Sequence, residues 1–345
     1  MALVKVYSKE DIQKLTRKRG GENKLGDEVS FVTGDWKKDL EQSPCLFVVI
    51  GIPEDIGVRA NYGRGGANTA FKPALDSFLS QQSNHFFDAR SVFVLGEVMV
   101  DDLMEASEKL DTKNKEDLQQ LRNLCKQIDD RVSAVVRQIV ALQKIPVIIG
   151  GGHNNAYGAI RGSAEALGHP LTVVNCDPHS DFRPLEGRHS GNGFSYAFNE
   201  GWLNRYALCC LHEQYNNNFS LEAFMKHPQQ LFYNTYESVF VREEKTFTEA
   251  LQQVISFVSM DDCGVELDLD AITNVPSSAK TSSGISPVQA RQYVHRAGSA
   301  LRCKYLHIAE GAPVLSHIKA DNKTGKLIAY LMTDFMKAVW EARTL

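Results

Sequence analysis

Three stretches of the sequence gather side chains that could bind metal ions. In the first, Asp177, His179 and Asp181 follow the apolar, β-branched run Leu171–Cys176, which predicts a buried strand ending where the polar residues begin. On an extended backbone these alternate side chains would point to one side. Two carboxylates and an imidazole held together would repel or stay partly protonated unless a cation lay between them. The alternative interpretation is a polar turn in which Asp177 and Ser180 act as caps.

The second stretch, residues 264–272, alternates apolar side chains with Glu266, Asp268 and Asp270. This is strand periodicity with three carboxylates on one face. A solvated edge strand could carry such a face, but edge strands usually include lysine and this segment has none. A cation site is the more economical interpretation.

In the third stretch, an apolar strand breaks at Gly150, Gly151 and Gly152 and is followed by His153. Glycines let the backbone turn sharply and approach another group closely. A single histidine here would more often be structural, but beside the other candidates it completes a set of four aspartates and two histidines without cysteine. Such ligands suit Mn²⁺. A mononuclear structural zinc site needs only four ligands and usually recruits thiolates, so the set favours two catalytic metal ions.

The elements that must position these residues alternate between strands and helices. Apolar runs predict strands at residues 45–51, 91–98, 145–149, 171–176, 206–211, 230–233, 264–270 and 305–310. Amphipathic spacing predicts helices at residues 8–18, 71 onward, 113–143, 157–167, 246–258, 287–301 and 327–343. Consecutive βαβ units give an α/β fold with a mainly parallel sheet, in which ligands bind at the carboxyl ends of the strands.

Length and composition predict one large domain. With 345 residues and 43% hydrophobic content, the chain can bury a large core. We expect residues 1–40 to form a peripheral extension and residues 41–345 a single domain. Residues 52–67 form a long glycine-rich loop of the kind that is usually functional. It lacks the Gly-Lys-Ser/Thr sequence of a phosphate-binding loop.

Charge and cysteine usage limit the partners and the compartment. A net charge of −4 argues against nucleic acid and anionic membranes as partners. The seven scattered cysteines are typical of reduced core residues. Since no apolar run approaches a membrane span and the amino terminus lacks a signal-peptide pattern, we expect a cytoplasmic protein.

Taken in chain order, the three motifs resemble those of the ureohydrolase superfamily, which includes arginase, agmatinase and formimidoylglutamase. The resemblance runs from about Phe47 to about Pro313. It implies a three-layer α/β/α arginase-like fold, assembly into trimers or hexamers, and two manganese ions per chain. In that family Gly-Gly-x-His, Asp-x-His-x-Asp and Asp-x-Asp segments hold the metal. Here the implied ligands are His153, Asp177, His179, Asp181, Asp268 and Asp270.

A competing segment leaves the position of the Asp-x-Asp motif open. The family often writes it Ser-x-Asp-x-Asp, and residues 259–263 read Ser-Met-Asp-Asp-Cys. We prefer Asp268 and Asp270 because they end the alternating strand. This choice puts Glu266 where serine is common in the family.

Within the superfamily, the formimidoylglutamases match best. They share the Gly-Gly-Gly-His turn, the Pro-Glu-Asp-x-Gly-Val loop and an Asp-x-Arg segment, here ending in Arg183. Arginases carry asparagine in place of Arg183 and a proton-transferring histidine in place of Phe194. The resemblance therefore implies hydrolysis of N-formimidoyl-L-glutamate to L-glutamate and formamide, a step of histidine breakdown. The alternatives are hydrolysis of a guanidino compound such as arginine or agmatine, and a catalytically silent homologue.

Roles for individual residues follow from the same resemblance. Glu310 corresponds to the strand-end glutamate that binds the amidine or guanidine of the substrate, and it could instead pair with a lysine or arginine. Asp270 is expected to orient the attacking hydroxide and His189 to move a proton to the leaving amine. Arg183 and Asn192 are expected to bind substrate. The alternative for Arg183 is a surface pair with Glu186.

Overall fold

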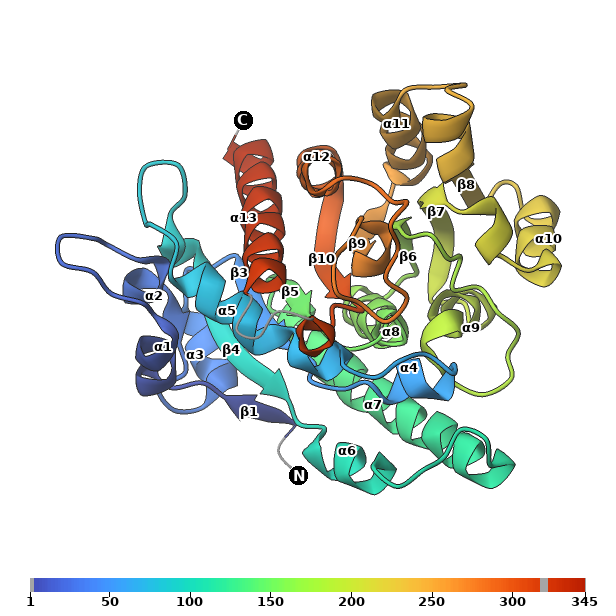
Figure 1. Cartoon of the computed structure of the whole chain (residues 1–345). Coiled ribbons are helices and arrows are strands. Elements are labelled where there is room, and N and C mark those ends of the chain that lie inside the picture. Colours follow the sequence, from blue (N-terminus) through green and yellow to red (C-terminus); the bar gives the residue numbers. More distant parts are fainter. Residues whose placement is uncertain (1–2, 317–321, 345) are drawn as a thin grey trace.

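The computed structural model of the chain describes residues 3–316 and 322–344, and its centre is a single ten-stranded sheet (Figure 1). Nine strands follow the order β1-β4-β3-β5-β10-β9-β6-β7-β8, and β2 pairs with β4. All the pairings are parallel except that of β1 with β4. The strands are β1 Val4–Val6, β2 Ser30–Phe31, β3 Phe47–Gly51, β4 Val92–Val98, β5 Ile145–Ile149, β6 Leu171–Cys176, β7 Leu203–Leu211, β8 Leu231–Thr235, β9 Asp262–Asp268 and β10 Arg302–Ala309.

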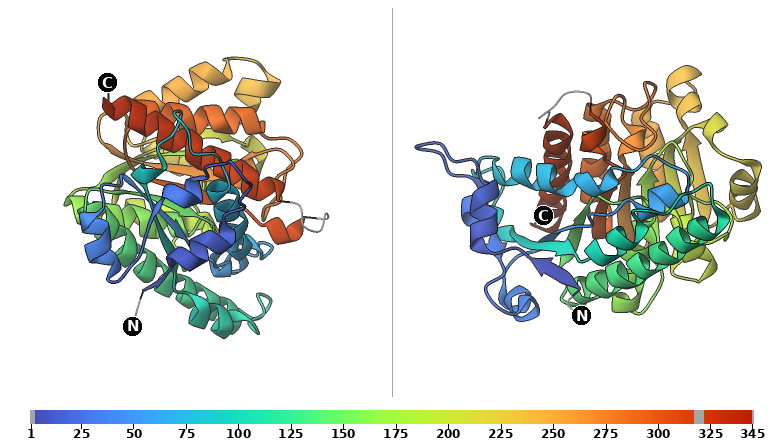
Figure 2. Two further views of the ribbon diagram at one scale, coloured as in Figure 1. Left: turned by 90° about the vertical axis from the view of Figure 1, so that its left-hand side faces the viewer. Right: turned by 60° about the horizontal axis from the view of Figure 1, so that its bottom comes forward.

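Helices cover both faces of the sheet and make three layers (Figures 1 and 2). One layer contains α5 Phe71–Leu79, α11 Phe247–Val258, α12 Pro287–Ala300 and α13 Lys323–Thr344. The other contains α4 Ile56–Ala60, α6 Asp101–Ser107, α7 Lys115–Ala141, α8 Asn155–Leu167 and α9 Gly193–Asn199. The remaining helices are peripheral: α1 Lys9–Leu15, α2 Leu25–Glu28, α3 Trp36–Gln42 and α10 Asn218–Lys226. The α/β fold predicted from the βαβ pattern is confirmed.

Two hydrophobic clusters lie on opposite faces of the sheet and hold the layers together. Strand residues alternate between them, so Val147 contributes to one cluster and Ile148 to the other. The long helix α7 begins at Asn114, whose side chain accepts hydrogen bonds from the backbone of Glu116 and Asp117. Its apolar stripe, including Ile128, is buried against the sheet and against α8. The sheet is therefore rigidly held on both sides beneath the edge where the ligands were predicted.

The structure adds short elements that the sequence patterns did not predict. Strands β1 and β2 precede the strand expected to be first, and β1 lies on the sheet edge. Part of the extension predicted at residues 1–40 thus contacts the sheet, and Ile12, Leu25 and Leu40 are buried. The division of the chain at residue 40 stays a prediction. Within the loop predicted at residues 52–67, Ile56–Ala60 forms helix α4.

The structure shows the environment of the cysteines and the character of the helices. All seven cysteines are free and buried. Among the helices of residues 3–316 and 322–344, none combines the length and the apolar character that crossing a membrane requires.

Candidate metal centre

Four neighbouring strands end at the same edge of the sheet, and each delivers polar side chains there. In sheet order they are β5, β10, β9 and β6. His153 follows β5, Glu310 follows β10, Asp268 ends β9 and Asp177 follows β6. Because these strands are parallel, residues up to 157 positions apart in sequence, such as His153 and Glu310, converge on one small region.

The turn after β5 depends on its glycines. Gly150 and Gly151 have φ angles of 86° and 74°, a region that favours glycine. The turn directs the N–H of Gly152 to Glu54, which is fully buried, at 2.9 Å, and the N–H of His153 to Oε1 of Glu310 at 2.8 Å. The backbone of the third predicted motif is thus fixed by two buried carboxylates.

The segment after β6 reaches the same edge by a different path from the predicted one. The backbone does not stay extended: Pro178 and His179 form bends, and Asp181 has a positive φ of 45°. Oδ1 of Asp177 accepts a hydrogen bond from the N–H of His179 at 2.7 Å, which holds the bend. The prediction that an extended strand aligns these side chains was wrong, because a turn brings them together.

The segment after β9 also departs from regular alternation. Asp268 is the last residue of β9, and Asp270 lies in the 3₁₀ turn Leu269–Ala271. The N–H of Asp270 donates to Oδ1 of Asp268 at 2.6 Å, and Oδ1 of Asp270 accepts from the N–H of Ala279 at 2.9 Å. The competing acidic segment lies at the other end of β9, where Asp262 faces Lys304 at 3.3 Å.

The six predicted ligands assemble into two adjacent groups. In one, Nδ1 of His153 lies 3.0 Å from Oδ2 of Asp177, 3.0 Å from Oδ2 of Asp181 and 3.2 Å from Oδ2 of Asp268. The other contains His179, Asp268 and Asp270, with one ligand atom of each within 4.8 Å of the others. Asp268 belongs to both groups, and Oδ1 of Asp177 lies 3.4 Å from Nδ1 of His179. Two metal positions sharing carboxylates are what this arrangement can provide.

The protonation of the cluster reflects crowded negative charge. Burial, followed by repulsion from neighbouring aspartates, raises the pKa of Asp268 and Asp181. Burial alone would lower the pKa of His179, but its hydrogen bond and charge interaction with Asp177 raise it to about 10. In the same way, burial opposes protonation of His153, and the surrounding carboxylates raise its pKa well above the ordinary value. Cations between these groups would relieve the repulsion and replace the protons.

The residues present fit divalent metal ions. Both ring nitrogens of His153 are buried without a hydrogen-bond partner among the described residues, although Nδ1 has three carboxylate oxygens within 3.2 Å. A set of aspartates and histidines without thiolates suits Mn²⁺ or a similar ion. His153, Asp177, Asp181 and Asp268 would hold one ion, and His179, Asp177, Asp268 and Asp270 the other.

A pocket of about 220 Å³ opens over the cluster. Glu310 lines it, and burial followed by the charge of Asp270 raises the pKa of Glu310 to about 8. Oε2 of Glu310 has no hydrogen-bond partner in the described part of the chain. Arg183 also lines the pocket, with a side chain that is 45% exposed and lies 3.5 Å from Glu186. This geometry is compatible with both roles considered for Arg183, which are substrate binding at the pocket rim and an ion pair with Glu186.

His189 and Asn192 are predicted site residues that lie outside both the ligand cluster and the pocket lining. His189 is fully buried, its Nδ1 accepts a hydrogen bond from the N–H of Gly191 at 3.1 Å, and burial lowers its pKa to about 3. The side chain of Asn192 is also buried and bonds to the carbonyl of Gly187 at 2.8 Å and to Arg188. These two residues hold the turn whose Ser190 and Gly191 do line the pocket.

Comparison with known proteins places this geometry in a family. The arginase family matches residues 46–337, which is most of the chain. The chain belongs to the arginase family. It is therefore a hydrolase of the ureohydrolase type, and its relatives include the formimidoylglutamase of Streptococcus pyogenes serotype M12. That protein is 25% identical over 292 residues, which cover 82% of this chain and 81% of the relative.

Solved structures share the arginase-family fold at low sequence identity. The formimidoylglutamase of Bacillus subtilis has a TM-score of 0.74 at 16% identity and covers 95% of each chain. The formiminoglutamase of Trypanosoma cruzi, crystallised with Mn²⁺, has a TM-score of 0.70 at 18% identity and covers 92% of this chain and 98% of its own. These likenesses confirm the three-layer architecture.

This arginase-family site includes buried residues that the sequence analysis did not single out. Glu54 holds the turn before His153, while Tyr305 and His307 contact Glu266 beneath the cluster. A signal for the last two exists in the sequence: in the buried second half of β10 they alternate with Leu306 and Ile308, and they therefore lie on one face of the strand. Phe194, which the sequence analysis did consider, packs edge-on against His153, with ring centroids 5.2 Å apart.

Proposed function

We propose that the chain hydrolyses N-formimidoyl-L-glutamate to L-glutamate and formamide with the help of two Mn²⁺ ions. The observation that carries this proposal is the convergence of the six candidate ligands and Glu310 at one pocket whose rim bears Arg183. Similarity to formimidoylglutamases of two bacteria and a trypanosome supports the choice of substrate. The substrate carries two carboxylates and one amidine, and the pocket offers a cation and a carboxylate for them.

When bound, the two ions would supply Lewis-acid activation of a water molecule for attack on the amidine carbon. Glu310 is proposed to accept hydrogen bonds from the amidine nitrogens, since its Oε2 has no other partner among the described residues. Asp270, fixed by Ala279 and by the hydroxyl of Ser278 at 3.2 Å, is proposed to orient the nucleophile. The bond from this carbon to the glutamate nitrogen would then break, and that nitrogen would gain the proton that the attacking water has lost.

His189 is a poor choice for the proton donor in this scheme. Its Nδ1 already accepts a hydrogen bond from Gly191, and its Nε2 faces Glu186 at 3.2 Å. We therefore propose that His189 shapes the turn at residues 189–192.

Two further proposals follow the family resemblance. We infer assembly into trimers or hexamers, which analytical ultracentrifugation would test. We also infer a cytoplasmic location, in agreement with seven free, buried thiols.

Metal analysis and a substrate panel test the proposed function. After reconstitution we expect about two Mn²⁺ per chain, activity lost to chelators and restored by manganese. Formimidoyl-glutamate should be hydrolysed with a much higher kcat/KM than arginine or agmatine. Robust agmatine hydrolysis would favour a guanidino hydrolase. Two bound ions without turnover on any of the three compounds, or less than one bound ion per chain, would favour a silent homologue.

A matched pair of variants tests the ligand assignment. Asp268→Asn should lose metal and turnover because Asp268 belongs to both ligand groups. Asp261→Asn, which changes the residue just before the start of β9, should keep both. The reverse result would show that the competing acidic segment holds the metal.

A further inference from the structure

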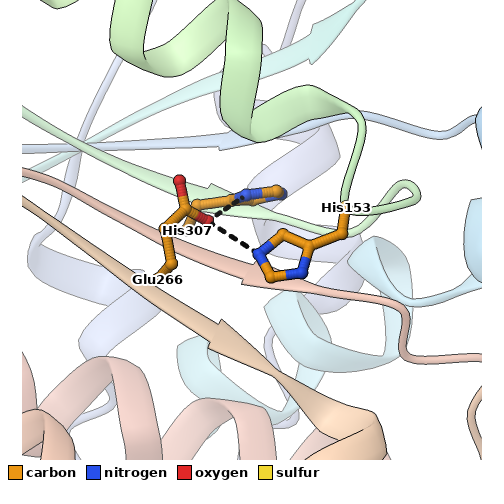
Figure 3. Close-up of side chains that lie close together, drawn as sticks. All are labelled: His153, Glu266 and His307. Atoms are coloured by element: carbon orange, nitrogen blue, oxygen red, sulfur yellow. Dashed lines mark hydrogen bonds and ion pairs between the residues drawn. The ribbon is translucent and has the colours of Figure 1, made fainter. Parts of the chain in front are cut away.

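A buried carboxylate lies behind the metal ligand His153. Glu266 is fully buried on β9, and its Oε2 lies 3.3 Å from Nε2 of His153 (Figure 3). Nδ1 on the other side of the same imidazole ring faces Asp177, Asp181 and Asp268. The ring thus stands between the candidate metal position and Glu266.

The Glu266 carboxylate is itself held by two neighbours on β10. Oε1 accepts a hydrogen bond from the hydroxyl of Tyr305 at 2.8 Å, and Oε2 lies 2.7 Å from Nδ1 of His307. His307 and Glu266 are direct partners in the register of the two strands, so the pair is part of the sheet. The other ring nitrogen of His307 lies 3.3 Å from the carbonyl of Gly150, in the turn that leads to His153.

If Glu266 formed only a structural ion pair with His307, its carboxylate would not need to contact His153 as well. A buried charge is costly unless it is paired and hydrogen-bonded, and His307 with Tyr305 would satisfy that need. The contact of Oε2 with Nε2 of His153 is additional and points toward the metal centre (Figure 3).

We propose that Glu266 is a positioning residue for the metal ligand His153. The 3.3 Å contact between Oε2 and Nε2 is not a hydrogen bond in the metal-free chain. With Nδ1 bound to a metal ion, the proton of the neutral imidazole would lie on Nε2, where the charge of this carboxylate would attract it and keep the lone pair of Nδ1 facing the three aspartates. Tyr305 and His307 fix the carboxylate in turn. This inference rests on the proposed metal centre and extends it to the residues behind the first ligand.

The test compares two manganese-binding constants in the unaltered protein and in Glu266→Gln, measured by competition with a chelator. The group containing His153 should bind manganese roughly 10- to 100-fold more weakly in the variant, the scale for losing an outer partner of a ligand. The group containing His179 and Asp270 should keep its constant, because those residues do not belong to the cluster of Glu266. Equal weakening of both constants would indicate general damage and overturn the inference, as would two unchanged constants.

Tyr305→Phe is the matched control, because it removes a hydrogen bond to Oε1 and leaves the oxygen that faces His153. It should weaken manganese binding by the group containing His153 less than Glu266→Gln does and leave the other constant unchanged, because His307 still holds the carboxylate. A loss equal to that of Glu266→Gln would contradict the inference. If Glu266→Gln does not fold, Glu266→Ser replaces it with the same expected selective loss. Failure of the unaltered protein to bind manganese would overturn both the proposed function and this inference, whereas two bound ions in both proteins with equal constants would overturn the inference alone.

Discussion

Arg183 is the residue on which the choice of substrate depends most. Its guanidinium lies on the rim of the pocket, on the chain segment that leaves Asp181. Guanidinium is a planar, permanently charged group suited to a carboxylate. It would attract a substrate with carboxylates and repel the cationic end of agmatine. Its partial exposure and the nearby Glu186 limit the strength of that attraction.

We expect Arg183→Ala to lower kcat/KM for formimidoyl-glutamate by roughly 5- to 30-fold, equivalent to about 1 to 2 kcal/mol of transition-state binding. The loss is smaller than for a fully buried charge pair because the side chain is 45% exposed. Steady-state kinetics with formimidoyl-glutamate, arginine and agmatine would measure it. Manganese content should not change.

Arg302→Ala serves as the control for that experiment. Arg302 begins β10 at the opposite end of the sheet and is 63% exposed, so its loss should leave kcat/KM unchanged. Indifference of the enzyme to Arg183→Ala would remove the main support for formimidoyl-glutamate as the substrate.

At the scale of single residues, the sequence predicted which residues lie together better than it predicted the path of the backbone that carries them. The six candidate ligands meet at one edge although the path after Cys176 is a turn and Asp270 lies beyond its strand. Residue types and their order report which strand ends carry polar groups. They do not report the bends of the backbone. His189 and Asn192 were therefore expected to act in the pocket, whereas the turn that carries them directs their side chains away from it. Glu54 was missed because its role requires a partner 98 positions away.

At the scale of elements, Arg188 joins three helices to the pocket wall. Its guanidinium is buried, donates to both oxygens of Asp129 on α7 at 2.8 and 3.2 Å, and lies 4.9 Å from the ring centroids of Tyr157 on α8 and Tyr196 on α9. It also bonds to Asn192 in the adjoining turn. Burial raises the pKa of Asp129 to about 7 despite the charge of Arg188. Removing one partner would therefore leave the other buried and unpaired.

We expect Arg188→Met to lower the free energy of unfolding by about 3 to 5 kcal/mol, the scale for breaking a buried ion pair. The double variant Arg188→Met, Asp129→Leu should recover most of that loss, because it removes both charges. Urea denaturation of the metal-loaded proteins would measure these changes. Arg161→Ala, which breaks ion pairs of a 31% exposed side chain with Asp130 and Glu165, should cost only about 1 kcal/mol or less. Similar losses for Arg188→Met and Arg161→Ala would contradict the anchoring role.

The elements that the sequence predicted are the long and regular ones. Helices α7, α8, α11, α12 and α13 carry sustained apolar spacing, and the buried parallel strands are β-branched runs. The missed elements are short or depend on tertiary contacts. Strand β1 has three residues and exists through its antiparallel pairing with β4, and helix α9, Gly193–Asn199, contains no charged residue and no side-chain cap.

At the scale of the whole molecule, the metal centre couples folding to pH. In the metal-free protein, the hydrogen bond and charge of Asp177 raise the pKa of His179 from 6.5 to about 10. Burial raises the pKa of Glu310 from 4.5 to about 8. In both cases the folded chain holds a proton that the unfolded chain has already lost in the intervening pH range. Stability from these groups is therefore present at low pH and lost as pH rises, between 6.5 and 10 for His179 and between 4.5 and 8 for Glu310.

Manganese should reverse this trend, because it binds the deprotonated ligands and releases their protons. We expect the Tm of the metal-free protein to fall as pH is raised from about 6.5 to about 8.5, where both groups lose their stabilising protons. Metal affinity rises over the same range, so the difference in Tm between the manganese-loaded and metal-free proteins should grow with pH. Scanning calorimetry at constant ionic strength would measure both curves. Asp268→Asn, which is expected to bind no metal, should show no difference at any pH. A constant difference in the unaltered protein would mean that His179 does not exchange its proton for metal, and that the ions bind elsewhere than at this sheet edge.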